Sequence, residues 1–411
     1  MTKYIAYTAF ALATALAVQG TAHAAPGDPI RVGDGITIDP QIDMRLRYES
    51  VNTPVLDADA MIARLRAGLD VGLGHGFSVL GEVEGTLSVK DHYNSTVNGH
   101  TGYATVADPE SIELNRLAVR WSQHGTTVTA GRQRINIDDQ RFVGSVGWRA
   151  NEQTFDAVRV ESNALGKVAI DLTYSNGQRT IFGSESTTRT SLEGDFVFAN
   201  AVATFAPVTL RVFDYYLNYD AVEPNALRNS SNTVGAKASA RFTLRPGTTI
   251  DLSGTYAHQV DVGPTTANYA ADYIAASAAL AHRGYTLTAA YEELGSDGGV
   301  EAFQTPMATL HKFNGWADLF LATPVNGLRD YQIALARAFP AGHSPIPGLT
   351  MGVAWHRFEG DHGGAHYGDE WDAQIGFRIT RVGVTLKYAD YNASAFGRDT
   401  SKLWVQLDYQ Y

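Results

Sequence analysis

The sequence predicts an all-β protein that closes into an antiparallel transmembrane β-barrel of about 18 strands with long extracellular loops. The first observation is composition: the 411 residues include 40 Gly and 20 Tyr, and only 18% are charged. Ordinary soluble domains are roughly 25% charged. The second is recurring segments in which apolar and polar side chains alternate, as in a strand with one face in lipid and the other in water. The third is that, beyond the N-terminus, no apolar run approaches the ~20 residues of a membrane-spanning helix.

The composition also excludes several classes of protein. The aromatic content of 10% argues against disorder. The chain has no Cys, which removes disulfides, thiolate metal sites and thiol catalysis. The formal charge of −11 argues against a nucleic-acid partner.

The N-terminus has the features of a secretory signal peptide. Lys3 precedes an apolar run over residues 4–18, and Ala22-His23-Ala24 is an A-x-A cleavage signal. A retained membrane anchor is disfavoured because the run is short and ends in small residues. We therefore expect residues 1–24 to be removed, residues 25–411 to form one barrel domain, and the protein to reach the bacterial outer membrane.

The last segment shows the alternation most clearly. One parity carries Leu403, Val405, Leu407, Tyr409 and Tyr411, and the other carries Trp404, Gln406, Asp408 and Gln410. Similar alternation occurs within residues 42–49, 63–71, 77–90, 250–256, 370–379 and 382–388. A bilayer would cover the apolar face directly, whereas a soluble sandwich would need a second sheet.

Eighteen candidate strands follow from this pattern, and they must close because an open sheet edge in hydrocarbon leaves backbone groups without hydrogen bonds. They begin near residues 37, 60, 76, 111, 126, 155, 167, 195, 208, 233, 248, 268, 285, 330, 349, 368, 382 and 401. Tight links such as Gly74-His75-Gly76 suit periplasmic turns. Long links suit the extracellular side, at 91–110, 135–153, 176–194, 219–232, 295–329 and 359–367.

The polar parity of the first six strands is rich in arginine. If the polar side chains of these strands point into the barrel, six arginines lie in the lumen: Arg45, Arg47, Arg64, Arg66, Arg116 and Arg120. We expect Arg132, Arg134 and Arg159 beside them. Rows of arginine favour anions in pores, and the guanidinium keeps its charge and binds carboxylates through two hydrogen bonds. In the alternative, these side chains only solvate the channel and pair with Asp43, Asp70, Glu82 and Glu84.

Two long aromatic segments, residues 135–154 and 303–330, interrupt the alternation. Side chains such as Phe142, Trp148 and Trp316 suit a solvated loop tip poorly, so we expect both segments to fold into the lumen or cap its mouth. The alternative is a pair of ordinary outer loops, each with a small core of its own.

These segments also carry a family resemblance. The first reads Gly131-Arg132-Gln133, Asp138-Asp139-Gln140-Arg141-Phe142, Trp148-Arg149 and Gln153-Thr154-Phe155-Asp156-Ala157; the second reads His311-Lys312-Phe313-Asn314-Gly315-Trp316-Ala317-Asp318, Pro324 and Gly327-Leu328-Arg329-Asp330. Together they resemble the alginate-export outer-membrane family. The resemblance implies an eighteen-stranded barrel whose arginine-rich constriction passes an anionic uronic-acid polymer. The constriction residues that it implies are Arg132, Arg134, Arg141, Arg149, Arg159 and Arg329, with Asp138, Asp139 and Asp156 as ion-pair partners. We expect Lys312 of the second segment at the constriction as well.

The resulting hypothesis is a passive outer-membrane channel for an alginate-like polysaccharide or oligosaccharide. The alternatives are a porin for small organic anions such as aromatic carboxylates, a general diffusion porin, and a barrel that transports nothing. The expected partners are outer-membrane lipid, an anionic carbohydrate or organic acid, and, for a polymer exporter, periplasmic export proteins.

We expect no enzymatic activity and no cofactor. A barrel phospholipase would need a Ser and a His on adjacent strands at the lipid surface, and no such pair stands in alternating register. His362 and His366, in a Gly-rich loop with Asp361, Asp369 and Glu370, are a candidate divalent-cation site, but a solvated loop is favoured and no metal is expected.

Overall fold

The computed structural model describes residues 29–32, 35–186, 189–220, 228–263, 268–340, 342, 344 and 346–411. The expected signal peptide, residues 1–24, lies outside the described residues. No helix in these ranges is long and apolar enough to cross a membrane, which does not bear on crossing by strands.

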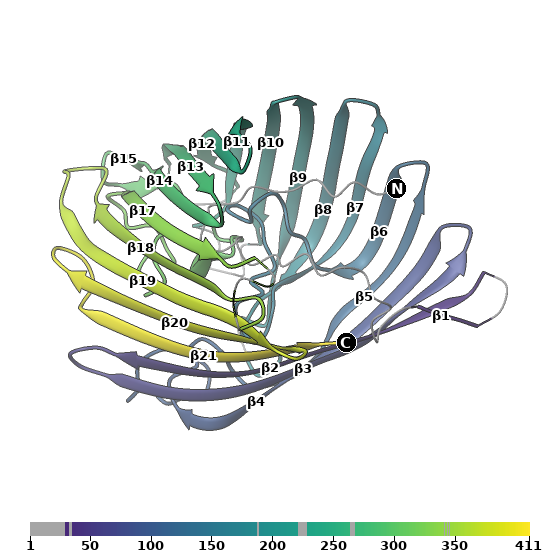
Figure 1. The fold of residues 1–411 in the computed structure, drawn as a ribbon, viewed down its shortest axis with the longest axis horizontal. Helices are drawn as coiled ribbons and strands as arrows, with labels where there is room; N and C mark the ends of the chain where they lie inside the picture. Colours follow the sequence, from purple (N-terminus) through teal and green to yellow (C-terminus); the bar gives the residue numbers. More distant parts are fainter. Residues whose placement is uncertain are drawn as a thin grey trace.

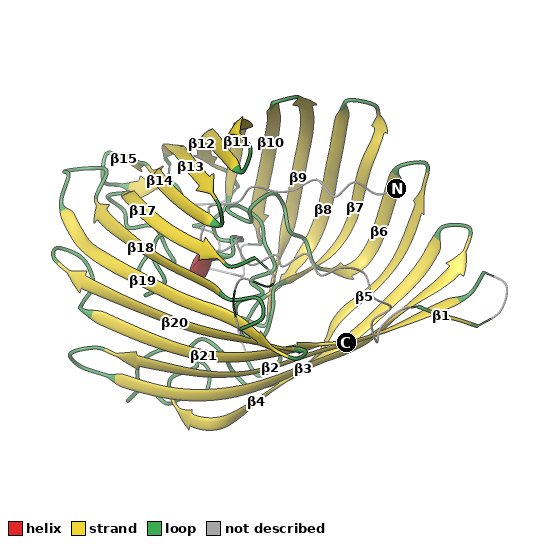
Figure 2. Ribbon diagram, in the orientation of Figure 1, coloured by secondary structure: helices red, strands yellow, loops and turns green. Residues whose placement is uncertain are grey.

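The described chain forms one large antiparallel sheet that closes on itself (Figures 1 and 2). The sheet contains 19 strands, and all except the two-residue β1 (Ile30–Arg31) belong to the barrel wall, which leaves 18. The wall strands are β2 (Thr37–Asn52), β3 (Asp57–Gly74), β4 (Phe77–His92), β5 (Ser111–Gln123), β6 (Thr126–Gln133), β7 (Thr154–Leu165), β8 (Val168–Arg179), β9 (Ser191–Phe205), β10 (Val208–Tyr219), β11 (Ser231–Arg245), β12 (Thr248–Asp261), β13 (Ala270–His282), β14 (Tyr285–Leu294), β17 (Leu328–Ala338), β18 (Thr350–Glu359), β19 (His366–Ile379), β20 (Val382–Ala393) and β21 (Thr400–Gln410). Each pairs with its neighbours along the chain, and β2 pairs with both β3 and β21, which closes the barrel.

The predicted fold class and strand number are confirmed. The largest discrepancy is at β9, which begins at Ser191 rather than near residue 195. Alternation locates strands this well because each wall strand contacts lipid on one face and the barrel interior on the other.

The predicted orientation of the strands is also confirmed. On β3, Leu65 is 47% exposed on the outer face, whereas its neighbours Arg64 and Arg66 are buried inside the barrel. On β21, Leu403 is exposed and Trp404 is completely buried. The apolar parity therefore faces outward around the wall, where a bilayer would cover it.

Three of the short turns have a backbone that explains their sequence. His75-Gly76, His124-Gly125 and Arg283-Gly284 have positive φ at both residues. This is the conformation of two-residue hairpin turns whose twist matches that of the flanking strands, and glycine tolerates it best. In outer-membrane barrels short turns lie in the periplasm, so this end of the barrel is the periplasmic end.

Two segments leave the wall and fill the interior: loop A, residues 134–153 between β6 and β7, and loop B, residues 295–327 between β14 and β17. Loop B contains the short hairpin β15 (Ser296–Asp297) and β16 (Glu301–Ala302), and the 3-10 turn η1 (Leu310–Lys312). The loops are hydrogen-bonded to each other, from Gly144 N to Met307 O at 2.9 Å and from Thr309 N to Gln140 O at 3.1 Å. The predicted folding of both segments into the barrel is thus observed.

The core lies where these loops meet the wall. The ring of Phe142 on loop A packs against Phe213, Tyr215 and Tyr273 of the wall and Phe303 of loop B, with ring centres 5.1–6.1 Å apart. The two loops therefore share one core with the wall, in place of the separate small cores of the alternative.

Candidate functional site

A cavity of about 710 Å³ occupies the periplasmic part of the lumen. Four arginines line one side of it, and we call them the basic wall: Arg116, Arg120, Arg134 and Arg159. Register explains their convergence, because Arg120 on β5 and Arg159 on β7 both stand opposite Thr129 on β6. All four were predicted to face the lumen.

Carboxylates pair with the basic wall, and two of them, Asp70 and Glu161, line the same cavity. Arg116 Nε and Arg134 Nη2 donate to Glu82 Oε1 at 2.8 and 3.0 Å, and Glu82 is only 4% exposed. Arg120, whose side chain is 50% exposed, pairs with Asp70 at 3.0 Å. The predicted neighbouring carboxylates are therefore present, but in the Arg134–Glu82 pair the guanidinium is the more exposed group. A solute in this cavity would therefore meet the arginines together with the carboxylates of Asp70 and Glu161, whereas Glu82 is buried.

A second group of predicted arginines faces inward but lies under loop A. Arg45 Nη1 donates to Gly147 O and Trp148 O at 3.0 and 2.9 Å, and Arg47 also donates to Trp148 O. Arg64 pairs with Asp43, and Arg66 pairs with Glu84 and donates to Ala150 O. Because Arg47, Arg64 and Arg66 are buried, we correct their expected role: none of the three lines the open cavity, and Arg47 and Arg66 hold loop A against the wall.

Three predicted charged residues join the two loops to each other and to the wall. Arg141 of loop A donates to Glu292 Oε1 on β14 at 2.6 Å and to Thr305 Oγ1 of loop B at 2.8 Å. Arg149 pairs with Asp318 at 3.0 Å, and Lys312 Nζ donates to Asp139 O at 2.7 Å. These side chains form a lock between the loops.

Three other predicted residues lie on the outer face: Arg132, Asp156 and Arg329. This position corrects their assignment to the constriction. Arg132 stands opposite the lipid-facing Leu117 and pairs with Asp156 at 2.8 Å. Arg329 pairs with Glu293 at 2.8 Å and stands two residues from the outward Tyr331. We expected Arg132 beside the other lumen arginines and Arg329 from the family resemblance, but the parity of β6 and β17 places both side chains on the outer face.

Asp138 and Asp139 have different partners from those expected. Lys237 on β11 donates to both, at 2.6 and 2.9 Å, and Arg211 on β10 lies 3.7 Å from Asp138. Lys237 was missed, although it shares the polar parity of its strand with Thr233 and Ser239, which would have indicated an inward side chain.

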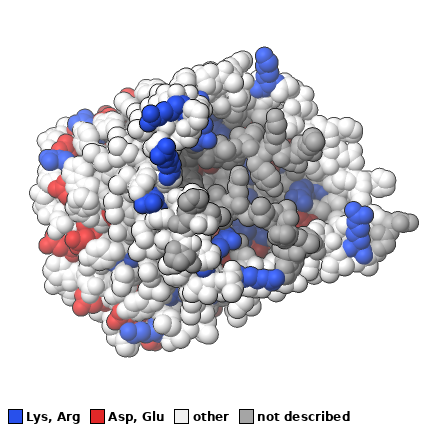
Figure 3. Space-filling model, viewed as in Figure 1, with Lys and Arg blue, Asp and Glu red and all other residues white. Residues whose placement is uncertain are grey.

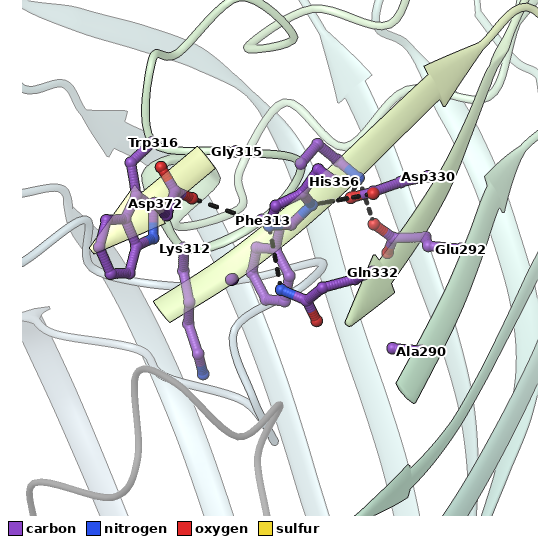
Figure 4. A pocket seen from close by; sticks show the side chains of 12 residues that line it. Ala290, Glu292, Lys312, Phe313, Gly315, Trp316, Asp330, Gln332, His356 and Asp372 are labelled. Atoms are coloured by element: carbon purple, nitrogen blue, oxygen red, sulfur yellow. Dashed lines mark hydrogen bonds and ion pairs between the residues drawn. The ribbon is translucent and has the colours of Figure 1, made fainter. Parts of the chain in front are cut away.

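A small cavity of about 40 Å³ lies between loop B and the wall (Figure 4). His356 lies there between Asp330, 2.9 Å from its Nδ1, and Asp372, 3.7 Å from its Nε2. The space is sufficient for one or two water molecules but not for an organic solute. Across the described ranges, no three His, Cys, Asp or Glu side chains converge as a metal site requires.

Comparison with known proteins identifies the family. The model of the alginate-export family matches residues 37–294, more than half of the chain. The chain belongs to the alginate-export family. No curated protein sequence is significantly similar to this family member.

Solved structures share the fold of this alginate-export family member. It superposes on OpdO of Pseudomonas aeruginosa with a TM-score of 0.70 at 13% identity, covering 91% of this chain and 97% of that one. For OccK9 (OpdG) of the same organism the TM-score is 0.73 at 13% identity, covering 91% of this chain and 98% of that one. For OpdK with vanillate, also from that organism, the TM-score is 0.68 at 16% identity, covering 92% of this chain and 98% of that one. The family member is therefore an outer-membrane, porin-like channel that crosses the membrane with many strands, and this family and fold are in general not enzymatic.

Loop B of this family member also holds a buried histidine, His311, which lies beside the contacts between the loops. Its Nε2 accepts a hydrogen bond from Lys387 Nζ at 2.8 Å, so the ring proton is on Nδ1, which donates to Asp318 at 2.7 Å. Burial lowers the pKa of His311 to about 3, well below its ordinary value near 6.5. The imidazole is therefore neutral while the loops are closed.

Acidification should consequently loosen the loops. Below a pH of about 6.5 an exposed His311 binds a proton that the closed state binds only near pH 3, so opening becomes more favourable by up to about tenfold per pH unit between these values. Channel current noise in planar bilayers should rise from pH 7 to pH 5, and His311→Gln should flatten this dependence. Equal noise at both pH values in the parent protein would contradict the prediction.

Proposed function

We propose that this alginate-export family member is a passive channel for small organic anions, such as aromatic carboxylates. The observation that carries the proposal is the cavity of about 710 Å³ with the basic wall along one side. That volume is in the range that encloses a small organic ligand, roughly 300–1,000 Å³.

The basic wall suits a carboxylate in two ways. Guanidinium groups remain charged at every physiological pH and bind a carboxylate through two parallel hydrogen bonds. The carboxylates that pair with these arginines, among them Glu82, Asp70 and Glu161, weaken that attraction, so that an anion can leave the cavity as well as enter it. Binding that is favourable but weak is what conduction requires.

The structural neighbours favour the same substrate class. One of them, OpdK of Pseudomonas aeruginosa, was solved with vanillate, an aromatic carboxylate. Loops A and B, joined by Arg141, Arg149 and Lys312, fill the interior of this chain beyond the cavity. A small anion would need a smaller rearrangement of these loops than a polymer would.

The family match supports a second candidate, an oligouronate. Uronic-acid sugars carry the same carboxylate that the basic wall would recognise, and the alginate-export model covers the arginines of that wall. A short oligomer would use the same arginines, so the two candidates differ in the size of the solute.

Reconstitution in planar bilayers tests the proposal. We expect a greater permeability to chloride than to potassium, and a current that millimolar benzoate or vanillate reduces by occupying the cavity. Benzyl alcohol and benzamide, uncharged molecules of similar size, are the controls and should leave the current unchanged. Block by a trimeric or longer oligouronate without block by benzoate would support the second candidate, and a pore insensitive to both would contradict anion recognition.

A further inference from the structure

Five side chains from neighbouring strands form a polar row on the outer face at the periplasmic edge of the barrel. We call it the outer-face row: Arg245 on β11, Thr248 on β12, His282 on β13, Tyr285 on β14 and Arg337 on β17. Each member stands directly opposite the next in the strand register. The row faces away from the lumen, because Tyr285 and Arg337 share their parity with Leu287 and Leu335, which are 50% and 46% exposed.

The row is joined by hydrogen bonds and ring contacts. Arg245 Nε donates to Thr248 Oγ1 at 3.2 Å, and the same oxygen lies 2.8 Å from His282 Nδ1. Arg337 donates to the hydroxyl of Tyr285, and its guanidinium carbon lies 4.5 Å from the centre of that ring and 4.1 Å from the centre of the Phe339 ring. The guanidinium of Arg337 is thus held by neutral aromatic groups, which leaves its charge uncompensated.

The surroundings of the row contain arginine but no carboxylate. Residues 242–250, 280–288, 335–350 and 376–386, which include four periplasmic links, contain no Asp or Glu but include Arg245, Arg283, Arg337, Arg378 and Arg381. In the part of the chain that the structure describes, neither Arg245 nor Arg337 has an acidic partner, in contrast to the arginines of the lumen. Figure 3 shows Lys and Arg around the hollowed part of the visible face, whereas Asp and Glu gather near its left edge.

We propose that the outer-face row binds the phosphate headgroup of an anionic phospholipid in the inner leaflet of the outer membrane. The row lies where the strands leave hydrocarbon for the periplasm, immediately below the exposed leucines Leu287 and Leu335. Tyr and Trp rings commonly occupy this interfacial depth, and arginines beside them attract anionic lipids. A free anion in the lumen could not reach the row, because the wall strands separate the two.

Native mass spectrometry of the detergent-purified barrel tests the proposal. Increasing amounts of phosphatidylglycerol or phosphatidylcholine are added, and the bound lipid is counted on the intact protein. We expect a clear preference for phosphatidylglycerol, and a loss of roughly tenfold or more in its binding to the double variant Arg245→Gln/Arg337→Gln, since an arginine near an anionic lipid surface contributes about fivefold.

Arg241→Gln is the matched control, because Arg241 lies on the same strand but pairs with Asp251 on the lumen side. It removes one positive charge, as the single variant Arg337→Gln does, and should leave lipid binding unchanged. The single variant Arg337→Gln, at an exposed position, replaces the double variant if the latter does not assemble. Equal binding of the two lipids by the parent, or full retention of phosphatidylglycerol by the variants, would overturn the proposal.

Discussion

Replacement of Arg120 by Glu should lower the ratio of anion to cation permeability by about sixteenfold at low salt. The side chain is half exposed in the cavity of the basic wall. A change of two charge units at ~10 Å from a permeating ion in water alters its energy by about 0.8 kcal/mol, which corresponds to about fourfold in permeability. Because the sign is opposite for an anion and a cation, the ratio of the two permeabilities changes by about sixteenfold. The reversal potential in a potassium chloride gradient measures the effect, which should weaken as salt shortens the screening length to about 10 Å at 0.1 M.

The matched control for this experiment is Arg132→Glu. It changes the net charge by the same amount, but Arg132 pairs with Asp156 on the outer face and should leave the reversal potential unchanged. Arg134→Glu should act in the same direction as Arg120→Glu, because Arg134 also lines the cavity. If the Arg120 and Arg134 variants both kept the reversal potential of the parent, the basic wall would not set selectivity.

The barrel could be predicted from the sequence because its cause is local. Every wall strand contacts two different solvents, and this shows in neighbouring residues such as Arg64 and Leu65, one buried inside and the other exposed outside. The turns His124-Gly125 and Arg283-Gly284 have a local signature as well, since each two-residue hairpin requires positive φ.

The candidate site was predicted in part, because a side chain is placed correctly only where the prediction follows the parity of its own strand. Parity placed Arg116 and Arg120 in the lumen, as observed. Arg132 was expected beside the lumen arginines and again from the family resemblance, and Arg329 from the resemblance alone, yet the parity of their own strands puts both on the outer face.

The sequence did not predict which of the inward arginines line the cavity and which are buried under loop A. Arg47 is buried because the carbonyl of Trp148, about a hundred residues later in the chain, folds onto it. The pairing of Lys237 with Asp138 and Asp139 likewise depends on the path of loop A across the barrel. Such contacts are set by how a long loop fills the space between wall strands, and no local pattern encodes that path.

Removal of the Arg141 guanidinium should have the largest effect on the conducting state. Arg141→Met keeps the bulk of the side chain but breaks its contacts with Glu292 of the wall and with Thr305 and Asn314 of loop B. Deleting one partner of a buried ion pair costs about 3–5 kcal/mol, because the other charge stays buried without compensation. We expect loops A and B to separate from the wall, so that single-channel conductance and current noise both increase severalfold.

Arg189→Met is the control for this prediction, because Arg189 lies in the link between β8 and β9, outside loops A and B, and donates to Thr96. It should leave conductance unchanged. The wall should remain intact in both variants, since its strands are joined by their own backbone hydrogen bonds; circular dichroism of the purified proteins checks this.

A second variant separates the loss of the lock from the cost of an isolated charge. In Arg141→Met/Glu292→Gln both charges are absent, and a buried pair replaced by neutral groups of similar volume is often tolerated. If uncompensated charge on Glu292 drives the loops apart, the double variant should recover most of the parent's low noise, and the non-additivity measures the coupling between the two side chains. If the hydrogen bonds of Arg141 to loop B carry the closure, the double variant should stay as noisy as Arg141→Met. Parent-like conductance and noise in Arg141→Met itself would show that neither contact holds the loops closed.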